Sequence, residues 1–131
     1  MRYLLDTHVW VWSLLEPDRL PRRVVQALEK PGNELWLSPI SVWELVMLVE
    51  RGRIVLDGDV GAWVDEALQR APLKEAPLTL EVALETHRVR LEHRDPADRF
   101  LVATARVFDL TLVTADARLI EVKDLSVLAA R

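Results

Sequence analysis

Short apolar runs alternate along this chain with longer segments of helical periodicity, and this alternation limits the folds open to it. Residues 3–5, 35–37 and 110–113 form runs of the length expected for buried strands, and a last short strand is expected around residues 125–128. Strands that alternate with helices favour a parallel sheet with helices on both faces. The sequence therefore predicts an α/β fold.

Helix-capping residues, prolines and glycines set the limits of the expected helices. Ser38 followed by Pro39 is a favoured helix start, and Gly52 can end the same helix. The expected helices cover residues 22–30, 39–51, 60–70, 79–91 and 96–107, with a further one through Trp10 and Trp12. The proline-containing stretch 71–78 is expected to connect two of them.

The length and composition of the chain suit one domain over residues 1–131, because half of its 131 residues are apolar. Asp6 and His8 interrupt the apolar start, so a cleaved leader is not expected. No apolar run reaches the ~18 residues of a membrane-spanning helix, which makes a cytoplasmic protein without membrane contact the default expectation. Because cysteine is absent, any metal must be bound by oxygen or histidine.

Two carboxylates come shortly after expected strands. Asp6 directly follows the run 3–5, and Asp116 lies three residues after Val113. Each has an ordinary structural explanation, because aspartate caps helices and forms turns. In a parallel sheet, however, ligands bind beyond the carboxyl ends of the strands, and both residues are expected there.

Glu44 is the only charged residue in the segment 40–49, where apolar residues occupy nearly every face of the expected helix. Ser41 and Glu44 have the spacing of a capping box, but Ser38 is the better helix start and places Glu44 inside the helix. A charge in such surroundings is costly unless it is paired or bound to metal. The helix itself is expected to be buried or to lie at a partner interface.

Asp95 and Asp98 lie together at the start of the last long helix, where capping and the helix dipole normally explain acidic residues. Asp95 is the better N-cap because it directly precedes Pro96. Asp98 follows in the first turn, beside apolar residues. Asp98 is therefore the candidate ligand, with Asp95 as the alternative.

Asp6, Glu44, Asp98 and Asp116 together suggest a divalent metal site. Carboxylates that converge repel one another unless they are protonated or neutralised by a cation. An all-oxygen ligand set favours Mg²⁺ or Mn²⁺ over zinc. Such a site suits hydrolysis of phosphodiester bonds, because a bound metal activates water and offsets charge on the phosphate. We therefore expect these four acids to be both metal ligands and catalytic residues.

Basic and aromatic residues give weaker signals. The formal net charge of −4 argues mildly against nucleic-acid binding, but arginine outnumbers lysine 14 to 3, and guanidinium groups pair well with phosphate. The arginines near the acidic motifs are Arg51, Arg53, Arg88, Arg90, Arg94 and Arg99. Structural roles are expected for His8, His87 and His93, which lack zinc-site spacing, although His8 lies close to Asp6. The tryptophans are expected in the core or at an interface.

The motifs LLDTH, SPISVWEL, HRDPADRFLVATA and LVTADARL, in this order and spacing, resemble the PIN-domain family, specifically the VapC toxins of bacterial and archaeal type II toxin-antitoxin modules. The resemblance extends over essentially the whole chain. It implies a three-layer α/β/α fold, Mg²⁺- or Mn²⁺-dependent endoribonuclease activity on RNA, a homodimer, and inhibition by a cognate VapB antitoxin. By motif position it assigns the four acids to Asp6, Glu44, Asp98 and Asp116. It also gives Thr7 and Thr114 supporting roles toward the waters of the metal.

Two other functions stay open at this point. A Mg²⁺-dependent phosphatase also places aspartates beyond parallel strands, but it needs a second acid two residues after the first, where this chain has His8. A catalytically silent protein-binding module would use the apolar helices alone. Acid geometry separates the enzyme from the binding module, because four neighbouring acids support catalysis and four separate helix caps support binding.

Overall fold

The computed structural model describes residues 1–92 and 94–131, which build a five-stranded sheet around β1. The strands follow the order β3, β2, β1, β4, β5, and neighbouring strands are parallel throughout. Their bounds are β1 Arg2–Leu5, β2 Glu34–Leu37, β3 Lys74–Glu75, β4 Thr111–Thr114 and β5 Val127–Ala129. The first strand of the sequence is thus the middle strand of the sheet.

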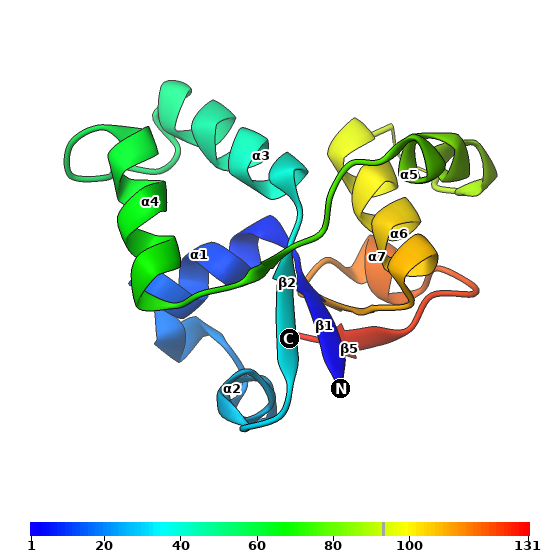
Figure 1. Ribbon diagram of the computed structural model, residues 1–131, viewed down its shortest axis with the longest axis horizontal. Helices are drawn as coiled ribbons and strands as arrows, with labels where there is room; N and C mark the ends of the chain where they lie inside the picture. Colours follow the sequence, from blue (N-terminus) through cyan, green and yellow to red (C-terminus); the bar gives the residue numbers. More distant parts are fainter. Residues whose placement is uncertain (93) are drawn as a thin grey trace.

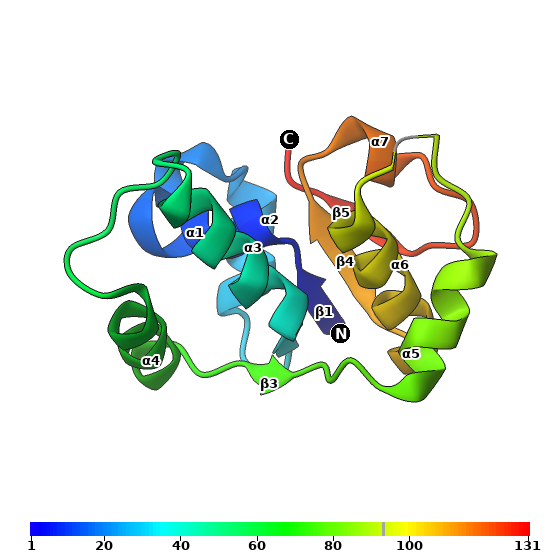
Figure 2. The ribbon, with the colours of Figure 1, turned by 90° about the horizontal axis from the view of Figure 1, so that it is seen from above.

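Helices cover both faces of this sheet (Figure 1). On one side lie α1 (Thr7–Leu15), α2 (Arg22–Glu29), α3 (Pro39–Glu50) and α4 (Val60–Arg70), and on the other α5 (Leu80–Glu85), α6 (Pro96–Phe108) and α7 (Ala117–Ile120). The view from above shows the same division (Figure 2). The expected three-layer α/β/α fold with a parallel sheet is therefore confirmed. None of the helices in residues 1–92 and 94–131 has the length and apolar character needed to span a membrane.

The central strands are buried on both faces. Leu5 and Val113 pack in a cluster with Trp10 of α1, whereas Leu4 and Leu112 pack in the cluster on the α6 side. Side chains of successive strand residues point to opposite faces, so each strand contributes to both clusters. A strand covered on both sides is mostly apolar on both faces, which explains why the runs ending at Leu5 and Val113 show little regular polar alternation.

The strand order reverses between β1 and β4. From β1 the chain adds β2 and β3 on one side, and then α5 and α6 carry it back across the sheet to β4 and β5 on the other side. Right-handed crossovers in opposite directions place the connecting helices on opposite faces. Such a reversal leaves a crevice at the carboxyl ends of the two strands, which is the usual ligand position in open α/β sheets.

The observed start of α3 agrees with the capping signals. Ser38 Oγ accepts a hydrogen bond from the backbone N–H of Ile40 at 3.0 Å. Beyond the other end of the helix, Gly52 adopts a positive φ of 70°, a conformation that glycine tolerates best. Ser38 rather than Ser41 is therefore the N-cap, and Glu44 lies inside α3 as expected.

Three local expectations differ from the structure. The helix expected over residues 79–91 ends earlier, as α5 followed by the 3₁₀ turn Thr86–Arg88. The expected connection 71–78 contains β3, and the short helix α7 was not expected. Elsewhere the 3₁₀ turn Pro17–Arg19 follows α1. The expected structural role of His93 falls on a residue outside the described ones.

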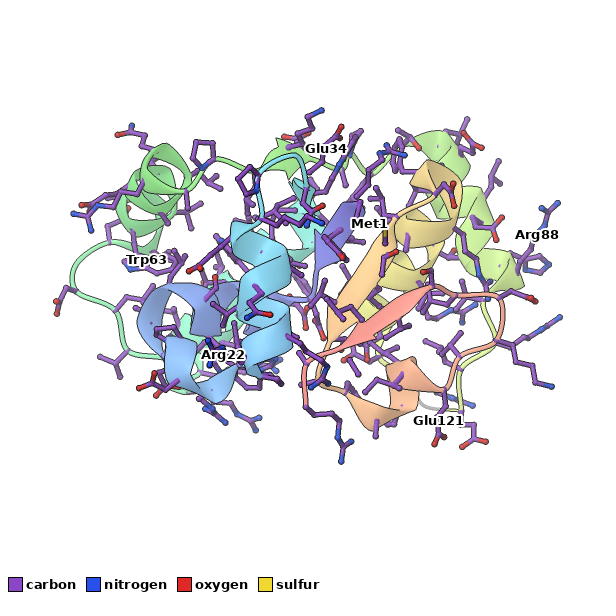
Figure 3. The ribbon with its side chains drawn as sticks, turned by 90° about the horizontal axis from the view of Figure 1, so that it is seen from below. Met1, Arg22, Glu34, Trp63, Arg88 and Glu121 are labelled. Carbon is purple, nitrogen blue, oxygen red and sulfur yellow. The ribbon has the colours of Figure 1, made fainter. Side chains whose placement is uncertain are left out.

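Most tryptophans lie in or against the core. The buried ring of Trp10 meets that of Trp63 from α4 edge to face, with 5.9 Å between centroids. Figure 3 shows Trp63 on the α1 to α4 side of the molecule. Trp43 differs, because 49% of it is exposed on α3. Of the two expectations for α3, burial or a partner interface, this exposed side chain agrees with the second, which stays a prediction.

Candidate active site

Asp6 and Thr114 join the ends of the two central strands. Asp6 is the N-cap of α1, and its Oδ1 accepts a hydrogen bond from the backbone N–H of Thr7 at 2.7 Å. Its Oδ2 accepts a hydrogen bond from Thr114 Oγ1 at 2.6 Å, although the two residues lie 108 positions apart. The same Oγ1 accepts a hydrogen bond from the backbone N–H of Asp116 at 3.1 Å. Thr114 thus links the segments of both strand-end carboxylates.

Glu44 reaches this place from α3. Its Oε1 accepts a hydrogen bond from Thr7 Oγ1 at 2.6 Å. Burial raises the pKa of Glu44 from its ordinary 4.5 to about 7, and the nearby charges of Asp6, Asp95 and Asp98 act in the same direction against the hydrogen bond from Thr7. The carboxylate therefore lies in the field of the other acids.

The pKa of Asp6 is raised as well. Burial is the main cause, and the charge of Asp116 adds to the effect. The hydrogen bonds from Thr114 and Thr7 and the charge of His8 lower it. His8 is exposed, and the centroid of its ring lies 5.7 Å from that of Trp12.

Arg118 connects Asp98 and Asp116. Its Nε donates to Asp116 Oδ1 at 3.1 Å, and its Nη2 donates to Asp116 Oδ2 at 2.8 Å. The same Nη2 lies 4.0 Å from Asp98 Oδ2, and the side chain of Asp98 is only 8% exposed. The Asp116 carboxylate also caps α7 by accepting from the backbone N–H of Arg118 at 2.9 Å. One guanidinium thus balances acids from two separate elements.

The two acids of α6 have different positions. Asp95 is the N-cap, as expected, and its Oδ1 accepts a hydrogen bond from the backbone N–H of Ala97 at 3.0 Å. Asp98 lies in the first turn, buried and close to Arg118. This arrangement favours Asp98 over Asp95 as the candidate ligand.

The acids are linked through threonines and Arg118 rather than gathered around one point. Within residues 1–92 and 94–131, no three His, Asp or Glu side chains are arranged as a group that could hold a metal ion. The donor chemistry still fits Mg²⁺ or Mn²⁺, because all four candidate ligands are carboxylates. Ser41 Oγ adds to this fit, because it is buried one turn before Glu44 and has no hydrogen-bond partner in the described part of the chain.

Arg118 and Ser41 are not among the residues singled out by the sequence. The two-residue spacing of Asp116 and Arg118 is the sequence signal that could have indicated Arg118. Of the arginines near the acidic motifs, Arg99 donates from Nη2 to the backbone oxygen of Thr86 at 2.7 Å and so ties α6 to the preceding turn. Such a tie favours a structural role for Arg99.

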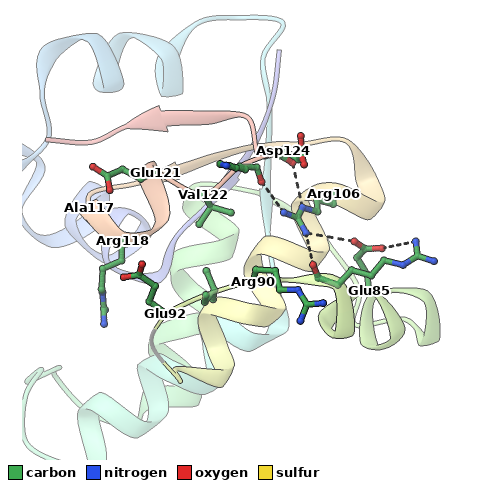
Figure 4. A pocket seen from close by; sticks show the side chains of 12 residues that line it. Glu85, Arg90, Glu92, Arg106, Ala117, Arg118, Glu121, Val122 and Asp124 are labelled. Atoms are coloured by element: carbon green, nitrogen blue, oxygen red, sulfur yellow. Dashed lines mark hydrogen bonds and ion pairs between the residues drawn. The ribbon is translucent and has the colours of Figure 1, made fainter.

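A hollow of about 960 Å³ lies beside Arg118 (Figure 4). Arg88 and Arg90, two more of the arginines near the acidic motifs, line it together with Arg118. Acidic side chains, among them Glu92 and Glu121, line it as well. The hollow therefore adjoins the candidate site through Arg118 and has walls of mixed charge.

Glu44 makes the stability of the metal-free protein depend on pH. A carboxyl whose pKa is higher in the folded than in the unfolded state holds its proton more tightly when folded. The free energy of unfolding should therefore fall as pH rises from 4.5 to about 7. Denaturant titrations in EDTA should show Glu44→Gln to be more stable than wild type at pH 8 by about 1 to 2 kcal/mol, after allowance for solvent screening.

Glu29→Gln is the matched control, because Glu29 is exposed at the end of α2. This variant should keep the pH dependence of the wild type. If Glu44→Gln also keeps it, the Glu44 carboxyl does not experience the burial and the neighbouring charge described above.

Comparison with known proteins agrees with the resemblance seen in the motifs. A family model described as the PIN domain matches residues 3–125. Ribonuclease VapC22 of Mycobacterium tuberculosis is 37% identical over 117 residues, which cover 88% of this chain and 88% of that protein.

Solved structures share the fold. VapBC2 from Rickettsia felis, bound to a DNA fragment from its promoter, superposes with a TM-score of 0.76 at 20% identity and covers 100% of both chains. DNA-bound VapBC from Salmonella typhimurium gives a TM-score of 0.71 at 18% identity and covers 100% of this chain and 99% of that one. By its family model, its sequence relative and its fold, this chain belongs to the PIN-domain family.

Proposed function

We propose that the protein is a metal-dependent endoribonuclease of the VapC type, which hydrolyses RNA phosphodiester bonds at the carboxyl ends of β1 and β4. The observation that carries the proposal is the linkage of Asp6, Glu44, Asp98 and Asp116, which come from four separate segments and are joined through Thr7, Thr114 and Arg118. Membership of the PIN-domain family and 37% identity to a protein named as a ribonuclease support the same reaction.

The four acids would hold Mg²⁺ or Mn²⁺. An ion of this kind supplies an activated water and positive charge for the phosphate group. Thr114 fixes the orientation of the Asp6 carboxylate, and Thr7 fixes that of Glu44. Carboxylates held in this way need little rearrangement when substrate arrives, which is how preorganised polar groups lower a reaction barrier.

Arginines beside the acids support RNA as the substrate. Arg88, Arg90 and Arg118 line one hollow next to Asp116, where guanidinium groups could pair with phosphates of the chain flanking the cut. Although the whole molecule has a net negative charge, these basic side chains give the hollow positive groups that can meet phosphate. RNA in this position would be recognised through its backbone and its single-stranded shape.

A silent binding module is the competing proposal, and helix capping by Asp6, Asp95 and Asp116 is what favours it. Glu44 argues against it, because this residue lies in the middle of α3 and cannot cap that helix. The raised pKa of Glu44 also means that its charged form destabilises the fold, and a purely structural role does not explain a carboxylate at such a position.

Cleavage of a mixed structured RNA tests the proposed reaction. Purified protein should cut the RNA in Mg²⁺ or Mn²⁺, and EDTA should stop the cutting because the carboxylates then lack their cation. Gel analysis of end-labelled RNA would locate the breaks. Cutting that persists in EDTA, or no cutting with either metal by protein shown to be free of antitoxin, would contradict the proposal.

A VapB-like antitoxin is the proposed inhibitory partner. The support is that the structural neighbours include VapBC assemblies and a toxin-antitoxin complex from Klebsiella pneumoniae. The product of a small reading frame beside the gene should co-purify with this chain and suppress its nuclease activity.

A homodimer is proposed through α5. Leu80 and Leu84 lie one turn apart on this helix, with exposed fractions of 78% and 68%, and Leu78 precedes them. Because burying exposed leucine surface is favourable, a second copy should cover this stripe. Light scattering after size exclusion should find a wild-type dimer and a monomeric Leu84→Glu variant.

Val55→Glu is the matched control for the dimer, because Val55 is exposed in the loop between α3 and α4. This variant should stay dimeric. A Leu84→Glu protein that remains a dimer would place the interface away from α5.

A further inference from the structure

The positively charged guanidinium of Arg118 lies between two candidate metal ligands, Asp98 and Asp116. Its guanidinium spans both oxygens of Asp116 and lies 4.0 Å from Asp98 Oδ2. These two acids come from different elements, Asp98 from α6 and Asp116 from the turn after β4. The guanidinium pairs with Asp116 through two hydrogen bonds, as forked Arg–carboxylate pairs do, and it also approaches the carboxylate of Asp98.

The same oxygens cannot serve the guanidinium and a divalent ion equally well. A Mg²⁺ or Mn²⁺ ion shared by these carboxylates would lie within a few ångströms of the guanidinium, and like charges at that separation repel strongly next to a buried group such as Asp98. The absence of a metal-binding group within residues 1–92 and 94–131 agrees with carboxylates that are turned toward Arg118 instead.

We propose that Arg118 is an internal counterion of the metal-free site, and that divalent metal binds only as this guanidinium leaves Asp116 and Asp98. The inference rests on the proposed function, because it takes those two acids as metal ligands. Arg118 is thus a positioning residue. It keeps the acids of α6 and of the β4 end together until metal arrives, and it sets the affinity of the site for metal.

The surroundings of Arg118 give the displaced side chain a place to go. Its side chain is 58% exposed, so moving it breaks no core packing. The hollow that it lines also contains the carboxylates of Glu92 and Glu121 and the guanidiniums of Arg88 and Arg90 (Figure 4). An RNA phosphate bound there would attract Arg118 away from the acids. Metal and RNA should therefore strengthen each other's binding, because such coupling is reciprocal.

Calorimetric titration of Mn²⁺ into the full chain, first stripped of metal with EDTA, measures this competition without relying on activity. Arg118→Gln should bind Mn²⁺ about tenfold or more tightly than wild type, which corresponds to about 1.4 kcal/mol per factor of ten. Arg118→Lys should fall between the two, because lysine keeps the charge but loses the fork. Arg88→Gln is the matched control, because it removes one positive charge from the same hollow and leaves the acids untouched.

Thermal melts add a second measurement. Arg118→Gln should melt below wild type in EDTA, because Asp116 and Asp98 lose a countercharge, and Mn²⁺ should raise its melting temperature by more than it raises that of wild type. The inference is supported if Arg118→Gln binds Mn²⁺ more tightly than wild type does, or if it binds Mn²⁺ and wild type does not. Equal or weaker Mn²⁺ binding by a folded Arg118→Gln overturns it while the metal site stands. No Mn²⁺ binding by wild type and by Arg118→Gln overturns the metal site and this inference together.

Discussion

Asp6→Asn should lower the rate of RNA cleavage by about a thousandfold while leaving the metal-free protein at least as stable as the wild type. Asparagine keeps a side-chain oxygen that can accept from the backbone N–H of Thr7, so the cap of α1 survives. Its amide can donate to Thr114 Oγ1, which reverses the present hydrogen bond without breaking contact. The negative charge is lost, and with it the metal ligand. Single-turnover cleavage and a melt in EDTA measure the two effects.

Asp59→Asn makes the same chemical change at another helix N-cap. Asp59 caps α4 by accepting from the backbone N–H of Ala62 at 3.1 Å, on an exposed surface. This control should keep full activity. If Asp6→Asn unfolds the protein or loses several kcal/mol of stability, Asp6 is essential to the fold rather than to the reaction.

The pair Asp98→Asn and Asp95→Asn separates the two acids of α6. Asp98→Asn should reduce kcat/KM by about 100-fold to 1,000-fold, because it removes a buried charge next to the proposed metal position. Asp95→Asn should change kcat/KM by less than about threefold, because asparagine caps a helix as well as aspartate does. Steady-state kinetics on one short RNA measure both variants under identical conditions.

Both substitutions are isosteric, which makes each the control of the other. Melting temperatures should confirm that both variants fold before their rates are compared. The reverse order of effects, with Asp95→Asn inactive and Asp98→Asn active, would make Asp95 the ligand. Equal losses in both would mean that the start of α6, rather than one carboxylate, determines activity.

The sequence predicts those parts of the fold whose signals are local. The run before Asp6 and the run before Thr114 are apolar because each strand is covered on both faces, so composition alone marks their position. Ser38 marks the start of α3 because a side-chain cap leaves a recognisable residue next to proline. From the strand positions follows the expectation that Asp6 and Asp116 lie together at the strand ends.

Elements defined by tertiary pairing are not visible in this way. The strand Lys74–Glu75 consists of two exposed charged residues, and only their pairing with β2 makes them a strand. Helix α7 is four residues long, too short for a helical period to show. The contact of Arg118 with Asp98 joins positions 20 residues apart, and nothing local to either residue indicates it.

Because β1 pairs with β4, the candidate site can assemble only late in the synthesis of the chain. Asp6 leaves the ribosome early, whereas its partner Thr114 follows 108 residues later, about 5 to 20 seconds at usual rates of synthesis. Until then Asp6 has neither the neighbouring strand nor the acid of the β4 turn. A proposed nuclease that is made among RNA molecules is therefore inert while it is being translated. For the same reason, a product that terminates before β4 lacks Thr114 and Asp116 and should not cleave RNA.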